Sequence, residues 1–369
     1  MSPCLFSPFS LRSLALPNRI GMSPMCQYSS VDGFANDWHS VHWGSRATGG
    51  VAFILVEATA VSPEGRITPA DLGIWKDEHI ERLRQGVEFA HAQGSYMGIQ
   101  LAHAGRKASM ALPWQEESLV APELGGWQVV APSAIPFSAR YGMPLELNSA
   151  GIAKVIAAFR QAARRAVEAG YDFIEIHAAH GYLLHEFLSP LANRRIDEYG
   201  GEFGNRARLL LEVVDAVRAI LPEHLPLFVR ISATDWAEGG WDVDDSIRLS
   251  AELRTRGVDL IDVSSGGLVP GVRIPVGPGY QVPFSARIRA ETGIATAAVG
   301  MITDASQADE ILRAGHADLV LLARELLRDP YWALRAAAQL GARVSWPVQY
   351  LRAAASGATA RDPVSLEDD

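Results

Sequence analysis

Residues 173–182 read Phe-Ile-Glu-Ile-His-Ala-Ala-His-Gly-Tyr, a short strand pattern that runs into a cluster of polar side chains. Isoleucine at every second position between Phe173 and His177 predicts a β-strand, and the glycine before Tyr182 ends it. His177 and His180, at the carboxyl end of this strand, can point at one small oxygen atom, and the Tyr182 phenol can deliver a proton to a neighbouring atom. A single histidine here would more simply hold the loop through bonds to the backbone. Two histidines and a tyrosine together favour a functional site.

The same alternation of short apolar strands with longer helical patterns extends along the whole chain. We expect strands at Ile20–Met25, Val51–Ala58, Tyr96–His103, Phe173–His177, Leu227–Ser232, Leu260–Ser264, Ala295–Gly300 and Leu319–Ala323. We expect helices between and after them at Trp38–Thr48, Glu78–Gln93, Ser149–Ala169, Asn205–Ile220, Asp244–Arg256, Phe284–Glu291, Ala305–Ala314 and Pro330–Leu340.

Eight strand–helix units in one chain predict an α/β fold, a single (β/α)8 TIM barrel over residues 1–352. A doubly wound sheet is the alternative, but no Gly-x-Gly-x-x-Gly follows a predicted strand and nothing indicates a reversal of strand order. Residues 104–147, rich in Pro, Gly and Trp, form a long insertion after the third strand, where they would cap the mouth of the barrel. The small and acidic residues of 353–369 predict a disordered tail.

Composition excludes several classes of protein. The 369 residues are 48% hydrophobic, enough for a large core, and the net charge of −9 argues against a nucleic-acid-binding surface. No apolar run is long enough to span a membrane and the N-terminus lacks a signal-peptide pattern, so we expect a cytoplasmic protein. Because Cys4 and Cys26 are the only cysteines, a disulfide framework and four-cysteine zinc or iron–sulfur sites are excluded.

The carboxyl ends of the strands, where barrels of this type place their sites, carry a consistent set of polar and small residues. In chain order these are Ser23, Pro24, Met25, Cys26 and Tyr28, then Ala58, Gln100, His177, His180, Arg230, Ser264, Gly300, Ala323 and Arg324. The small residues after the last two strands, with Arg324, suit a phosphate group. Arg230 shares the parity of Phe228 and Ser232, opposite to the wholly apolar face of the same strand. Inside a barrel it needs an anionic partner. Together the set fits a planar, anionic, phosphorylated cofactor.

Each of these residues alone also has a structural interpretation. Arg230 could form an ion pair with Glu57 or Glu175. Gln100 could be a satisfied core amide, and Cys26 a buried inert thiol. Their shared position at strand ends favours the functional interpretation.

Several longer motifs resemble the Old Yellow Enzyme family of flavin-dependent ene-reductases, specifically its bacterial, thermophilic-like branch. The resemblance covers nearly the whole chain. It is carried by Pro17-Asn-Arg-Ile20, Ser23-Pro-Met-Cys-Gln-Tyr28, Gln100-Leu-Ala-His-Ala-Gly-Arg-Lys107, Ile176-His-Ala-Ala-His-Gly-Tyr-Leu-Leu-His-Glu-Phe-Leu-Ser-Pro190 and Asn193-Arg-Arg-Ile-Asp-Glu-Tyr-Gly-Gly201.

The resemblance implies a TIM barrel that binds FMN tightly and takes electrons from NADPH, with NADH as a possible donor. It implies no metal. Contacts with FMN are implied for Ser23, Pro24, Met25, Cys26, Ala58, Gln100, Arg230, Gly300, Ala323 and Arg324. Substrate contacts are implied for Tyr28, His177, His180 and Arg352, the last donated by a neighbouring subunit of a homodimer or homotetramer. Cys26 would also tune the flavin, and Tyr182 would be the catalytic acid.

The implied reaction has two halves. Hydride passes from NAD(P)H to FMN, and then to Cβ of an α,β-unsaturated aldehyde, ketone, imide or nitroalkene. His177 and His180 would bind the activating oxygen, and Tyr182 would protonate Cα.

Three other functions stay open at this point. The first is a metal-dependent TIM-barrel hydrolase that uses His177 and His180 with His185, although no His-Glu-x-x-His motif is present. The second is a Schiff-base aldolase that uses Lys107, although nothing in the sequence explains a lowered lysine pKa. The third is a catalytically silent binding protein.

Overall fold

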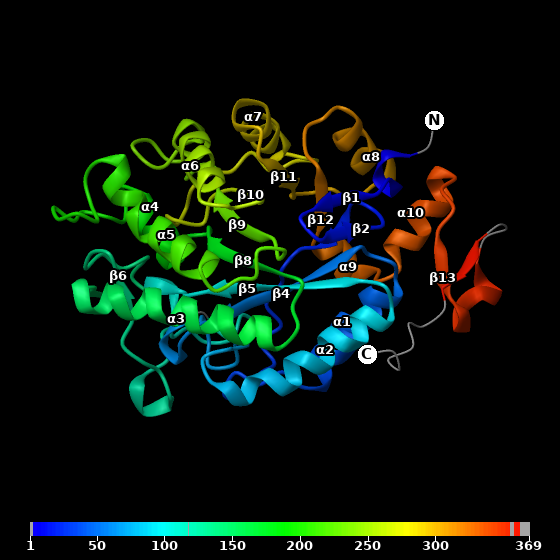
Figure 1. The fold of residues 1–369 in the computed structure, drawn as a ribbon. Coiled ribbons are helices and arrows are strands. Elements are labelled where there is room, and N and C mark those ends of the chain that lie inside the picture. Colours follow the sequence, from blue (N-terminus) through cyan, green and yellow to red (C-terminus); the bar gives the residue numbers. More distant parts are fainter. Residues whose placement is uncertain (1–2, 117, 355–357, 362–369) are drawn as a thin grey trace.

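A closed barrel of parallel strands forms the centre of the molecule (Figure 1). The computed structural model describes residues 3–116, 118–354 and 358–361. Within them the barrel strands are β3 (Ile20–Met22), β4 (Phe53–Ala60), β5 (Tyr96–Ala102), β8 (Phe173–Ala178), β9 (Leu227–Ser232), β10 (Leu260–Ser264), β11 (Ala295–Ala298) and β12 (Leu319–Leu322). The order is β10-β11-β12-β3-β4-β5-β8-β9, and β9 pairs with β10 to close the ring. This confirms the predicted (β/α)8 barrel and contradicts the doubly wound sheet, which is open.

Helices surround the strands (Figure 1). They are α1 (Asp37–Thr48), α2 (Ile80–Ala92), α3 (Ser149–Glu168), α4 (Leu183–Leu188), α5 (Phe203–Arg218), α6 (Val243–Thr255), α7 (Val282–Thr292), α8 (Ala305–Arg313), α9 (Arg324–Arg328) and α10 (Trp332–Leu340). Asn148, Asp242 and Asp304 start α3, α6 and α8 by accepting hydrogen bonds from backbone N–H groups of the first turn. The predicted helices are confirmed to within a few residues. The short helices α4 and α9 are not among them, because helices of this length show too little periodicity.

The lower interior of the barrel is an apolar layer. Phe173 lies 4.5 Å from Phe228 and 5.4 Å from Phe53 between ring centroids. The hairpin of β1 (Phe9–Leu11) and β2 (Leu14–Leu16), which the sequence did not predict, packs its leucines into this same cluster. The hairpin therefore covers the amino end of the barrel, where the interior would otherwise meet water.

The long insertion lies between β5 and α3 as expected, and contains the short strand pair β6 (Val130–Ala131) and β7 (Leu145–Glu146). Trp127 donates from its indole N–H to the carbonyl of Glu64, at 2.8 Å. Arg106 donates from Nη2 to the carbonyl of Leu268, at 2.7 Å. These bonds join the insertion to the segments that follow β4 and β10, at the carboxyl ends of the strands. Its role as a cap over bound substrate stays a prediction.

The prediction of a disordered tail over residues 353–369 is wrong for residues 359–361. They form β14 (Thr359–Arg361), which pairs with β13 (Ser345–Pro347). Arg361 donates to the carbonyls of Gln93 and Thr48, at 2.7 and 2.9 Å. Both carbonyls lie at helix carboxyl ends, where a cation is favoured, so this arginine fastens the strand to α1 and α2. Residues 355–357 and 362–369 lie outside the described part of the chain.

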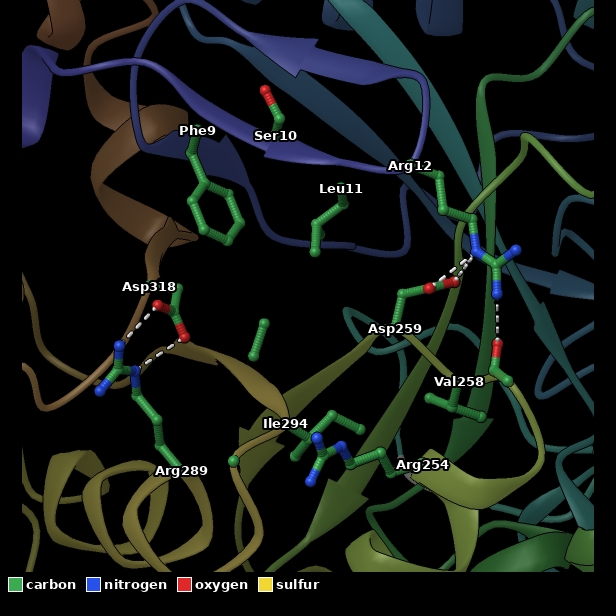
Figure 2. Close-up of a pocket in the computed structure, with 13 residues that line it drawn as sticks. Phe9, Ser10, Leu11, Arg12, Arg254, Val258, Asp259, Arg289, Ile294 and Asp318 are labelled. Carbon is green, nitrogen blue, oxygen red and sulfur yellow. Dashed lines mark hydrogen bonds and ion pairs between the residues drawn. The ribbon is translucent and has the colours of Figure 1, made fainter.

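The amino ends of the strands carry a cavity of about 600 Å³ (Figure 2). Arg12 pairs with Asp259 and Arg289 with Asp318, at nitrogen–oxygen distances of 2.7 and 2.9 Å. Arg254 donates to the backbone carbonyl of the last residue of α7. Each of these cations holds one part of the fold to another, as is usual at the amino end of a TIM barrel. Candidate catalytic residues gather at the opposite end.

No helix among the described residues is long and apolar enough to span a membrane.

The apolar layer predicts a strong dependence of stability on Phe173, which is fully buried. We expect Phe173→Ala to lower the free energy of unfolding by about 3–5 kcal/mol, because it leaves a cavity between two other rings. Phe173→Leu should cost less, since it keeps most of the volume. Leu124→Ala, at a side chain that is 79% exposed, is the control and should change stability by less than about 0.5 kcal/mol. Urea unfolding followed by circular dichroism measures all three. Equal midpoints for Phe173→Ala and the control would contradict the layer's role.

Candidate active site

The two histidines and the tyrosine of the opening motif converge at the carboxyl end of β8. His177 is an inward-facing residue of the strand, and the imidazole of His180 lies 5.1 Å from it between ring centroids. The Tyr182 ring lies 5.0 Å from His177 on another side, at an interplanar angle of 89°. The chain turns between them through positive φ at His180 (+59°) and Gly181 (+73°). The structure therefore brings together the three residues that the sequence singled out.

His177 has a defined tautomer. The backbone N–H of Ala179 donates to its Nδ1 at 3.2 Å, so Nδ1 is the acceptor and the ring proton lies on Nε2. This Nε2 faces Nδ1 of His180 at 3.4 Å. Burial, together with the positive charges of Arg230 and Lys107, lowers the pKa of both imidazoles. Both rings are therefore neutral, and each carries one N–H.

His180 is held at its backbone as well as at its ring. Its N–H donates to Ser232 Oγ at 2.9 Å, and its carbonyl accepts from Lys107 Nζ at 2.8 Å. Its Nε2 lies 2.7 Å from Ser264 Oγ. The residue adopts a left-handed conformation that is unfavourable for a side chain with a Cβ, and contacts of this kind keep it there.

Lys107 bridges two loops. Besides His180 it donates to the carbonyl of Gly267, at 3.0 Å, and its ammonium lies 4.6 Å from the ring centroid of Phe137 and 5.1 Å from that of Tyr182. Carbonyl oxygens and aromatic faces are partners of a charged ammonium, not of a neutral amine. The aldolase alternative requires a neutral, nucleophilic amine at Lys107, and these contacts do not support it.

Two glycines allow the loops after β8 and β10 to touch. A Cβ atom on Gly181 would lie 2.2 Å from the carbonyl oxygen of Gly267, and one on Gly267 would lie 2.7 Å from Cα of His180. Both distances are shorter than any real contact, and both glycines have positive φ. Close backbone approach at this place thus explains why glycine occupies both positions.

A layer of buried polar residues lies inside the barrel beneath the histidines. Gln100 Nε2 donates to Glu175 Oε1 at 2.8 Å. Arg230 pairs with Asp262, with 3.1 Å between Nε and Oδ2. The structural alternative in which Arg230 pairs with Glu57 or Glu175 named the wrong partner. Strand register sets Arg230 opposite Asp262, whereas Glu57 accepts the backbone N–H of Gln27 in the loop after β3. Burial and mutual repulsion raise the pKa of Glu175, and burial raises that of Asp262 to about 6.

This layer keeps hydrogen-bonding capacity for a polar ligand. Among the described residues, Glu175 Oε2 and both carboxylate oxygens of Asp262 accept no hydrogen bond. Buried polar atoms without partners are uncommon in proteins, and they mark places where a ligand or water completes the network. A buried guanidinium with an amide beside it suits a planar, anionic ring system such as that of FMN.

The loop after β3 brings a second group of expected residues together. Burial and the carboxylates of Asp71 and Glu57 raise the pKa of the Cys26 thiol, which is therefore uncharged. The Tyr28 side chain and the backbone of Ala58 favour a lower pKa of the Cys26 thiol, but their effect is outweighed. The segment Ser23-Pro24-Met25 leads into this loop from the end of β3, as the motif predicted.

A cavity of about 390 Å³ lies beside β11 and β12. Gly300, Ala323 and Arg324, all expected at a phosphate group, line it, and so does Ser264 from β10. Gly300 has a φ of +113°. A Cβ there would lie 2.6 Å from Nε2 of Gln281, so glycine leaves backbone accessible at the cavity wall. Backbone of this kind with an arginine beside it fits a phosphate monoester.

Some residues around the site were not predicted. Gln281 links the loops after β10 and β11, because its Oε1 accepts from Ser265 Oγ at 2.6 Å and its Nε2 donates to the carbonyl of Val299 at 2.9 Å. It lies just before α7, outside any strand end, so an inspection of strand ends alone misses it. Asp262 could have been found, because it is the one charged residue in the apolar strand pattern Leu260-Ile-Asp-Val-Ser264.

Arg352 is the expected site residue that the structure does not bring to the others. It lies in a 3-10 helix over Val348–Ala353 and is exposed. In Figure 1 this C-terminal segment, drawn in red, lies beside α10, while α4, which directly follows Tyr182, lies on the opposite side of the molecule.

The hydrolase alternative needs a third metal ligand near the two histidines. His185 was the candidate, but it is fully buried and pairs through Nε2 with Asp235 at 2.9 Å, while its Nδ1 accepts the N–H of Gly181. Across the described ranges, no group of three or more His, Cys, Asp or Glu side chains is arranged to hold a metal ion. The hydrolase alternative is therefore not supported.

Comparisons with known proteins place the chain in a family. The pattern of the NADH:flavin oxidoreductase / NADH oxidase family matches residues 4–342. An NADPH dehydrogenase of Geobacillus sp. (strain WCH70) is 53% identical over 354 residues, which are 95% of this chain and 99% of the relative.

Two solved structures have the same fold. Morphinone reductase is 31% identical, with a TM-score of 0.77 over 93% of this chain and 91% of that one. 2-Naphthoyl-CoA reductase is 23% identical with a TM-score of 0.82; this chain spans 52% of its length, and the likeness concerns the fold alone. The chain therefore belongs to the NADH:flavin oxidoreductase / NADH oxidase family and is an NAD(P)H-dependent oxidoreductase with FMN as its cofactor.

Proposed function

We propose that the chain is an ene-reductase, which uses NAD(P)H to reduce the carbon–carbon double bond of α,β-unsaturated aldehydes, ketones, imides or nitroalkenes. The observation that carries this proposal is the convergence of two neutral imidazoles and a tyrosine hydroxyl above the polar layer of the barrel. Bound FMN supplies the hydride transfer from the nicotinamide to Cβ of the alkene. The names of relatives favour NADPH as the donor, and morphinone reductase has been solved with tetrahydroNAD.

The histidine pair activates the substrate. An N–H from His177 and one from His180 bind the carbonyl or nitro oxygen, on which negative charge grows as hydride reaches Cβ. Because both rings are neutral, they stabilise this charge as hydrogen-bond donors and do not transfer a full proton to it. His177 is buried, and a hydrogen bond from a buried donor is stronger than one in water.

Tyr182 is the proton donor to Cα. Burial raises the pKa of its hydroxyl, so it remains protonated at the pH values at which NADPH is used. The Lys107 ammonium above its ring favours the phenolate that remains after proton transfer. Tyr28, in the same loop as Cys26, would contact the substrate.

The FMN-binding residues are proposed from the same arrangement. Gln100 and Arg230 hold the polar edge of the ring system, while Gly300, Ala323 and Arg324 hold the phosphate. The wall of the proposed FMN site at β3 and β4 would consist of Ser23, Pro24, Met25, Cys26 and Ala58. The uncharged Cys26 thiol would donate to the ring rather than repel it.

The role of Tyr182 gives the first test of the function. In Tyr182→Phe, rapid mixing with NADPH should bleach the bound flavin at the wild-type rate, because hydride donation needs no proton from Tyr182. Reoxidation by cyclohex-2-enone should slow by about 10²–10⁴-fold, the usual contribution of a general acid. Tyr199→Phe, outside the site, is the control. Slowing of the first step with normal reoxidation would place Tyr182 in another role, and no reduction of any activated alkene by the wild type would refute the proposed function.

Phenol binding tests the histidine pair. A phenol oxygen bound by the two N–H groups should lie over oxidised flavin and produce a long-wavelength charge-transfer band. The double variant His177→Ala/His180→Ala should lose this band, because both donors are gone. His224→Ala, at the opposite end of the barrel, should keep it. An unchanged band and affinity in the double variant would show that other residues bind the oxygen.

We also propose that Arg352 contributes to the active site of a neighbouring subunit. Val348, Tyr350 and Leu351 in the same 3-10 helix are each about two-fifths exposed (39%, 41% and 39%). Apolar and aromatic side chains exposed together beside an arginine are typical of an interface. The segment also lies away from α4 of its own chain (Figure 1). We therefore infer a homodimer or homotetramer in which Arg352 reaches the site of a neighbouring subunit.

Mixed subunits test this directly. Arg352→Ala should weaken use of substrate or NADPH and leave FMN content unchanged. When Arg352→Ala and Tyr182→Phe subunits exchange, some mixed sites receive both an intact Tyr182 and an intact Arg352, so activity should partly return. Either a monomer by light scattering or a lack of recovery after proven exchange would exclude a shared site.

A further inference from the structure

Ser264, the last residue of β10, lies between the histidine pair and the cavity beside β11. Its side chain is 6% exposed, and its Oγ lies 2.7 Å from Nε2 of His180. Its other possible partner is Oε1 of Gln281, at 3.4 Å. Ser264 was expected among the strand-end residues, but neither the family resemblance nor the proposed reaction gives it a role.

The distances decide where the Ser264 hydroxyl directs its hydrogen. Gln281 Oε1 already accepts a bond of 2.6 Å from Ser265 Oγ. A hydroxyl–oxygen distance of 3.4 Å is too long for a strong bond, whereas the contact with His180 has the normal length. The geometry therefore favours donation from the Ser264 hydroxyl to Nε2 of His180.

This donation determines the tautomer of His180. A neutral imidazole has one N–H, and if Nε2 accepts a hydrogen bond, the proton must lie on Nδ1. His177 carries its proton on Nε2, because its Nδ1 accepts from Ala179. The two N–H groups then face the same gap, in which the two nitrogens are 3.4 Å apart. One oxygen atom in front of that gap can accept both.

The other tautomer would disable the pair. With its proton on Nε2, His180 would donate to Ser264, and its bare Nδ1 would accept the N–H of His177. Both N–H groups would then be used within the protein. A substrate oxygen would meet no free donor, although every side chain stood in the same place.

We propose that Ser264 is a positioning residue that holds His180 in the Nδ1–H tautomer, so that the histidine pair presents two donors to one oxygen atom. Only the identity of that oxygen, as part of an activated alkene, rests on the proposed function. The tautomer of His180 depends on the chain's own hydrogen bonds and can be tested separately. Burial and the charges of Arg230, Lys107 and His185 lower the pKa of His180, which is consistent with a ring that carries a single proton.

Nitrogen NMR of the FMN-loaded protein, with ¹⁵N in the histidine rings, tests the tautomer. The His180 signals are assigned by their loss in His180→Gln. In the wild type and in Ser264→Thr, which keeps the hydroxyl, Nδ1 should be the protonated nitrogen. In Ser264→Ala the proton should move to Nε2. Ser285→Ala is the matched control, because that hydroxyl donates to the carbonyls of Val282 and His316 and touches neither His180 nor Gln281. It should leave the His180 signals in the wild-type pattern.

Phenol titration supplies the second measurement. Ser264→Ala should weaken phenol binding by at least about tenfold, the worth of one hydrogen bond, because the tautomer change withdraws both donors. Ser264→Thr should bind within about threefold of the wild type. A wild-type His180 protonated on Nε2, or an Ser264→Ala variant that keeps the Nδ1 proton and full phenol affinity, would overturn the proposal. If the enzyme reduced no activated alkene, the proposed function would fail, and the NMR result would still decide the tautomer.

Discussion

The buried guanidinium of Arg230 is the constraint on which the upper barrel depends. A positive charge inside a barrel needs a negative partner, and Arg230 has one in Asp262, with 3.1 Å between Nε and Oδ2. Glu175 lies in the same layer and accepts a hydrogen bond from Gln100. Burial raises the pKa of both carboxyl groups, and the charge of Arg230 only partly opposes this effect. Burial, and after it the charge of this cation, lowers the pKa of the histidines above. Burial and the buried cation together keep the imidazoles neutral, which makes them hydrogen-bond donors for an oxygen and not proton sources.

The barrel interior is layered, and the strands carry the layers in their sequence. In a parallel strand every second residue faces inward, and on β9 the inward residues are Phe228, Arg230 and Ser232. The same order of apolar, charged and polar residues recurs on two neighbours: Phe173, Glu175 and His177 on β8, and Leu260, Asp262 and Ser264 on β10. The aromatic layer stabilises the amino end. The polar layer separates it from the candidate site, so residues of the site can change without loss of the apolar core.

Local patterns predicted the barrel because they depend on one segment at a time. Period-two strands, helices and the inward parity of Arg230 all followed from the sequence. The partner of Arg230 did not follow. Glu57 and Glu175 were the candidates, whereas the pairing with Asp262 depends on the register between β9 and β10. The strands β1, β2, β13 and β14 were not predicted for a different reason. Each has only three residues, too few to show periodicity, and their pairing depends on contacts such as those of Arg361. The carbonyl contacts of Lys107 likewise depend on two loops meeting in space.

The strained conformation of His180 shows how the rigid barrel positions a residue of a loop. A left-handed conformation in a residue with a Cβ costs about 1 kcal/mol or more, and the isolated loop would avoid it. Here Ser232 on β9, Ser264 on β10 and Lys107 after β5 each hold a different polar atom of His180. Three bonds of about 1 kcal/mol each exceed the strain. Because they come from three different strands or loops, they fix the imidazole relative to the whole barrel, and an error in any one strand would displace it from His177.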